Sequence, residues 1–91
     1  MALANNYSRF TTANAGTILS PAPCVLHTVV INTGAAQTLT LYDGTSTAGT
    51  IIAVLTNTAT VLPDTMVYDV QCRVGLFAVS TGTGDITVTF G

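Results

Sequence analysis

The chain has 91 residues, of which 48% are hydrophobic and only 7% are charged, against about 25% charged residues in average soluble proteins. So little charge favours association, and we therefore expect the chain to function within an assembly. Two arginines, no lysine and a formal net charge of −2 argue against the phosphate neutralisation on which most nucleic-acid binding depends.

A chain of this length forms one domain with a marginal core, to which oligomerisation would add stability. No stretch reaches the roughly 18 to 20 consecutive apolar residues of a membrane helix. The first ten residues also lack the basic start and apolar block of a secretory signal. The sequence therefore predicts a protein that is made in the cytosol and has no membrane partner.

Residues 1–16 are polar, small and aperiodic, yet they include Tyr7, Arg9 and Phe10. Aromatic residues and arginine are the types that most often anchor protein interfaces. We therefore predict an extended N-terminal arm over residues 1–16 that docks on a neighbouring subunit through these three side chains. A loose terminus is the alternative. Residues 17–91 are then expected to form the folded domain.

The strands of that domain begin with residues 17–20, which end at a segment containing two prolines. Residues 24–32, CVLHTVVIN, are β-branched and nearly all apolar, which predicts a central strand. Residues 38–55 contain two strand-like runs around a loop that begins with Asp43-Gly44, and this pattern predicts a β-hairpin. The returning run, residues 51–55, is apolar on both faces, so it needs a cover from a second sheet or from another subunit.

The second half of the chain continues the β pattern. Residues 65–70 alternate, Gly75 predicts a bulge or bend, and residues 85–90 place Ile86, Val88 and Phe90 on one inward face. No stretch shows helical periodicity. The fold class we expect is all-β: a small antiparallel β-sandwich or jelly roll of seven to eight strands, preceded by the extended arm.

The inventory of reactive side chains predicts no catalytic, cofactor-binding or metal site. His27 is the only histidine, and strict alternation would put it on one strand face with Val25, Val29 and Ile31. No nucleophile elbow accompanies it, and the aspartates occur singly rather than at calcium-binding spacing. A sugar-stacking platform of Tyr42 and Tyr68 is a weaker alternative.

Cys24 and Cys72 lie far apart in the sequence, which fits neither a zinc cluster nor a redox Cys-x-x-C pair. Two buried thiols are the favoured interpretation. A disulfide stays open as an alternative if the strands bring the two Cα atoms within about 7 Å.

Five segments within residues 24–91 resemble small structural proteins of tailed bacteriophages: CVLHTVVINT from Cys24, LTLYDGTS from Leu39, GTIIA from Gly49, VYDV from Val67 and GLFAVSTGTGDITVTF from Gly75. The resemblance implies a β-sandwich virion component, most often a capsid decoration (cement) protein on the outer surface of the head. It also implies the major capsid protein as partner, self-association as a homotrimer or else a homodimer, and assembly in the host cytoplasm. The alternative is a receptor- or carbohydrate-binding module of a fibre or tail.

Overall fold

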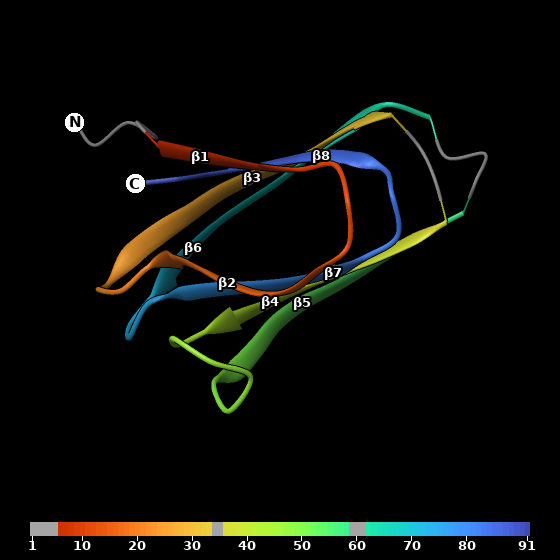
Figure 1. Ribbon diagram of the computed structural model, residues 1–91. Coiled ribbons are helices and arrows are strands. Elements are labelled where there is room, and N and C mark those ends of the chain that lie inside the picture. Colours follow the sequence, from red (N-terminus) through yellow and green to blue (C-terminus); the bar gives the residue numbers. More distant parts are fainter. Residues whose placement is uncertain (1–5, 34–35, 59–61) are drawn as a thin grey trace.

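The computed structural model describes residues 6–33, 36–58 and 62–91, which form eight strands and no helix. The strands are β1 (Asn6–Phe10), β2 (Asn14–Ser20), β3 (Cys24–Thr33), β4 (Gln37–Asp43), β5 (Thr50–Asn57), β6 (Asp64–Cys72), β7 (Leu76–Thr81) and β8 (Asp85–Phe90). They build two antiparallel four-stranded sheets, β1-β8-β3-β6 and β2-β7-β4-β5, which form two packed layers (Figure 1). The predicted all-β sandwich is confirmed.

The strand pairs are nested around the β4–β5 hairpin. β4 pairs with β5, β3 with β6, β2 with β7 and β1 with β8, so each pair encloses the previous one along the chain. β8 also pairs with β3, and β7 also pairs with β4, which completes each sheet. Nested pairs distributed over two sheets are the winding of a jelly roll. The hairpin predicted at residues 38–55 is the centre of this winding.

The core lies between the sheets and follows from alternation along the strands. Along β8, the buried Ile86, Val88 and Phe90 alternate with half-buried residues, which confirms the predicted inward face. β3 runs between β8 and β6, as expected of a central strand. The buried apolar side chains are Phe10, Cys24, Leu26, Val29, Ile31, Leu39, Leu41, Cys72, Leu76, Ala78, Ile86, Val88 and Phe90.

The structure differs from the predicted arm at its described residues, because Asn6–Phe10 is strand β1. It pairs along its whole length with β8, from Asn6 opposite Phe90 to Phe10 opposite Ile86. Phe10 is only 4% exposed and belongs to the core. The physical reason is that β8 has a second edge whose backbone groups need partners, and β1 supplies them. Residues 1–5 of the predicted arm lie outside the described residues.

The structure also corrects the expected alternation of β3. The register shifts between Leu26 and Thr28 against both neighbouring strands. Against β8 the extra residue lies in β3, at His27, whereas against β6 it lies in β6, between Val67 and Val70. Leu26 and Val29 are both buried although two residues, an even number, lie between them. His27 therefore does not share the inward face with Val29 and Ile31. Asp69, within the bulge of β6, has a left-handed φ of 49°, a conformation that aspartate adopts more readily than most residues.

A latch joins the last residue of β4 to the turn between β6 and β7. The Asp43 carboxylate accepts hydrogen bonds from the backbone N–H groups of Arg73 (3.0 Å), Val74 (2.9 Å) and Gly75 (3.4 Å). A Cβ on Gly75 would come 2.6 Å from the carbonyl oxygen of Ser20, so only glycine fits this turn. The predicted bend at Gly75 is thus a closely packed turn at one end of the sandwich.

Truncating Phe10 tests whether β1 is part of the folded domain. We expect Phe10→Ala to lower the free energy of unfolding by about 3 kcal/mol, since a buried phenylalanine leaves both lost apolar contact and a cavity. Tyr7→Ala is the control, because Tyr7 lies on the same strand and is 72% exposed. Urea unfolding followed by circular dichroism measures both variants. Equal midpoints for the two would contradict a structural β1.

Candidate functional site

Most ionisable side chains belong to one sheet. Arg9, His27, Asp69 and Asp85 lie on β1, β3, β6 and β8, which together form the sheet β1-β8-β3-β6. Asp64, at the start of β6, belongs to the same sheet. Asp43 and Arg73 lie instead at the latch. The two outer faces of the sandwich therefore differ strongly in charge.

A polar cluster spans three strands of the charged sheet. The Arg9 guanidinium donates two hydrogen bonds to the Asp85 carboxylate, one of them from Nε at 2.9 Å. The Asn32 amide nitrogen donates to Asp85 (3.2 Å) and to the Thr87 hydroxyl (3.0 Å). The bond from Arg9 is the main reason that the pKa of Asp85 is lowered and that the pKa of Arg9 is raised. The pair fixes β1 on β8, and its exposed position makes its contribution to stability small.

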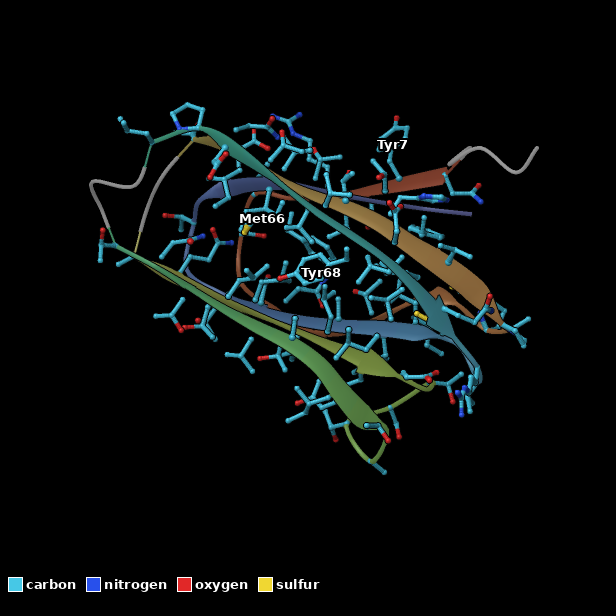
Figure 2. The ribbon with its side chains drawn as sticks, turned by 180° about the vertical axis from the view of Figure 1, so that it is seen from behind. Tyr7, Met66 and Tyr68 are labelled. Carbon is cyan, nitrogen blue, oxygen red and sulfur yellow. The ribbon has the colours of Figure 1, made fainter. Side chains whose placement is uncertain are left out.

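The three residues predicted to form a docking site do not share one surface. Phe10 points into the core, whereas Tyr7 is exposed and projects away from the sandwich (Figure 2). Arg9 is opposite Thr87 and Tyr7 is opposite Thr89, so both lie on the outer face of their sheet. The Arg9 guanidinium already donates hydrogen bonds to Asp85 of the same chain. Tyr7 and Arg9 are therefore both exposed on this outer face, and of the two only Arg9 is paired with a side chain of the same chain by a described contact.

His27 and Asp69 form a second polar pair, across the bulge of β3. His27 Nδ1 lies 3.0 Å from the Asp69 carboxylate, while His27 Nε2 is buried without a hydrogen-bond partner among the described residues. A hydrolytic triad needs a nucleophile hydrogen-bonded to that second nitrogen. Asp69 thus takes the place of the orienting carboxylate of such a triad, but no described side chain takes the place of the nucleophile. The His27–Asp69 pair suits a structural role beside the bulge.

The two cysteines are directly opposite each other on β3 and β6, and both are buried free thiols. This agrees with the favoured interpretation of the sequence. Burial, together with the neighbouring Cys24, raises the pKa of the Cys72 thiol to about 12. A thiol held in its neutral form is a poor nucleophile and a poor metal ligand.

Neither a metal cluster nor a ligand-sized pocket occurs within the part of the chain that the structure describes. Nor do the described residues include a helix long and apolar enough to cross a membrane.

The sugar-stacking platform that the sequence analysis gave as an alternative for Tyr42 and Tyr68 does not form. Tyr68 packs against the core beside Met66 in the space between the layers (Figure 2), whereas Tyr42 contacts Phe77 edge to face with ring centroids 6.1 Å apart.

The most prominent surface is one that the sequence analysis found only in part. On the outside of the sheet β2-β7-β4-β5, neighbouring strands place four large apolar residues in register in one row: Ile18, Phe77, Tyr42 and Ile51. A second row contains Val79, Thr40 and Val54. We call these seven residues the outer apolar face. The apolar pattern of residues 51–55 indicated one strand of it. Its extension over β7 and β2 depends on pairing that the sequence does not display.

Comparisons of the chain with protein-family models, with curated proteins and with solved structures gave no significant match. The candidate sites are therefore weighed on their geometry and chemistry.

The latch generates a prediction for pH dependence. Hydrogen bonds from the N–H groups of Arg73 and then Val74 lower the pKa of Asp43. Its contribution to stability is therefore present above the unfolded-state pKa of about 3.9 and is lost as the pH falls through the lower folded-state pKa. We expect Asp43→Asn to unfold at lower urea than the wild type at pH 7, with a difference that shrinks as the pH approaches 2.

Asp64→Asn is the matched control for this experiment, because the Asp64 carboxylate bonds only the neighbouring N–H of Thr65 among the described contacts. We expect it to change the urea midpoint much less than Asp43→Asn at pH 7. If both variants have the same midpoint at every pH, the latch does not stabilise the fold.

The buried thiols generate a prediction for reactivity. With a pKa of about 12 for Cys72, roughly one thiol in a few thousand is ionised at pH 8.5, whereas about half are ionised in the unfolded chain. We expect iodoacetamide to label Cys72 at least about 100-fold more slowly in buffer than in urea. Chymotryptic peptide mapping resolves it from Cys24. Equal labelling rates in buffer and in urea would show that Cys72 is not protected.

Proposed function

We propose that this chain is a non-enzymatic structural protein of a tailed-bacteriophage virion that acts as a capsid decoration (cement) protein. It would bind the outer surface of the head as a small homo-oligomer, with the major capsid protein as its partner, after assembly in the host cytoplasm. The observation that carries the proposal is the outer apolar face, an uncharged surface of this jelly roll that suits contact between the subunits of such an oligomer. Exposed apolar surfaces are typical of protein contacts rather than of small-molecule sites.

Two further observations support the virion setting. The strand sequences between residues 24 and 91 resemble small phage structural proteins. Jelly rolls also recur in viral capsid proteins and in lectins, although a fold by itself does not fix a function.

The mechanism would be stabilisation by mass action. A protein that binds only the assembled lattice stabilises it by RT ln(1 + [L]/Kd) per site, which is about 2.7 kcal/mol when its free concentration is 100 times Kd. An oligomer whose subunits touch several capsomers adds multivalency. No reactive side chain is needed for this function, which agrees with the internally satisfied Arg9–Asp85 pair and the unreactive Cys72.

A receptor- or carbohydrate-binding module of a fibre or tail is the second candidate. The observation in its favour is the Tyr42–Phe77 pair on the outer apolar face, since aromatic rings stack on sugars. Carbohydrate sites, however, also need polar groups that converge on the ligand. The strands that flank this pair, β2 and β5, place the aliphatic side chains of Ile18 and Ile51 beside it.

Location in the particle tests the proposal. In virions of a tailed phage that encodes this chain, we expect many copies per particle by quantitative mass spectrometry, and density on the outer head surface by cryo-electron microscopy. Phage lacking the gene should release DNA at a lower temperature, and adding purified protein should restore the wild-type temperature. Absence from virions, or density confined to a tail fibre, would contradict the decoration function.

A further inference from the structure

We propose that the outer apolar face binds the same face of a second copy of this chain, so that two sandwiches pack sheet on sheet in a two-fold dimer. This inference does not rest on the virion setting. It concerns the isolated protein and assigns a surface to its self-association.

The face is continuous across all four strands of its sheet. Ile18 on β2 is opposite Phe77 on β7, Phe77 is opposite Tyr42 on β4, and Tyr42 is opposite Ile51 on β5. Ile18, Ile51 and Val54 are each at least 50% exposed although all three are large aliphatic residues. A run of such residues in register is the pattern of a sheet face that packs against another layer.

Charge selects a second copy of this face as the occupant. A two-fold contact buries the same face of both copies, so any charge on the face would be buried twice and in the presence of a like charge. None of the seven residues of the outer apolar face is charged. The opposite outer face carries the Arg9–Asp85 pair and the His27–Asp69 pair, and it is therefore poorly suited to pack on itself.

The size of the sheet also fits a small dimer. Four strands at a spacing of about 4.8 Å, each some 7 residues long at about 3.3 Å per residue, give the outside of the whole sheet an area of roughly 450 Å². The outer apolar face lies toward the end of this area that is nearer the latch, with Tyr42 and Phe77 on the two middle strands. The smallest specific interfaces bury about 500 Å² per partner, so a contact over the outside of the sheet predicts a weak dimer.

The geometry favours two copies rather than three. Two flat sheets stack at a separation of about 10 Å with their strands at about −30°, and one such contact uses the whole face of each partner. A single self-complementary face is then fully used in a closed dimer. The homotrimer implied by the resemblance would need a different, heterologous contact.

The experiment measures the mass of the full chain by analytical ultracentrifugation between about 1 and 500 µM, for the wild type and for Val54→Lys. We expect a wild-type dimer, and a dissociation constant at least tenfold higher for Val54→Lys, because a buried lysine would lack a partner. Val67→Lys is the matched control, since Val67 is 66% exposed on β6 of the other sheet. It should dimerise like the wild type. Circular dichroism confirms that each variant is folded.

A mixing test identifies the occupant as the same face. Labelled Val54→Lys should bind the unlabelled wild type more weakly than the wild type binds itself, because a contact between two identical faces includes the altered face whichever copy carries it. A monomeric wild type at 500 µM, a dimer that Val54→Lys leaves intact, equal weakening by Val67→Lys, or binding of Val54→Lys to the wild type at wild-type affinity would each overturn the proposal. Because no virion is involved, these outcomes are separate from any failure of the decoration function.

Discussion

Backbone pairing nested around the β4–β5 hairpin is the constraint on which the rest of this structure depends. Each outer strand pair encloses the previous one, so the inner pairs hold β1 and β8 side by side although they are far apart in the sequence. β7 and β8 then occupy interior positions in their sheets and satisfy hydrogen bonds on both edges. The same winding puts the inward residues of both sheets into one core and leaves two outer faces of different chemistry.

The sequence predicts those features that depend on local patterns. The hairpin follows from alternation around Asp43-Gly44, the inward face of β8 from Ile86, Val88 and Phe90, and the bend from Gly75. Strand β1 was missed because its five mostly polar residues show no strand pattern of their own. They form a strand because they pair with β8, which is far away in the sequence. The register shifts beside His27 were missed for a similar reason: they arise where β3 pairs with β6 and β8, which no property of residues 24–32 reveals.

The distribution of charge connects the fold to its proposed role. Arg9, Asp85, His27 and Asp69 pair with one another on one sheet, so the few charges of the chain are largely satisfied within it. The outer apolar face on the other sheet has no internal partner. Because burial of apolar surface is favourable, this face would be stabilised by a contact with another protein. A structural protein within an assembly accounts for both properties.

The central claim is that the protein self-associates through the outer apolar face, and NMR at increasing concentration tests it most directly. Methyl and ring resonances of Ile18, Ile51, Val54 and Phe77 should shift with concentration along one binding curve, while those of Val67 and Tyr7 stay constant. Concentration-dependent shifts confined to the sheet β1-β8-β3-β6, with an unchanged outer apolar face, would contradict the account.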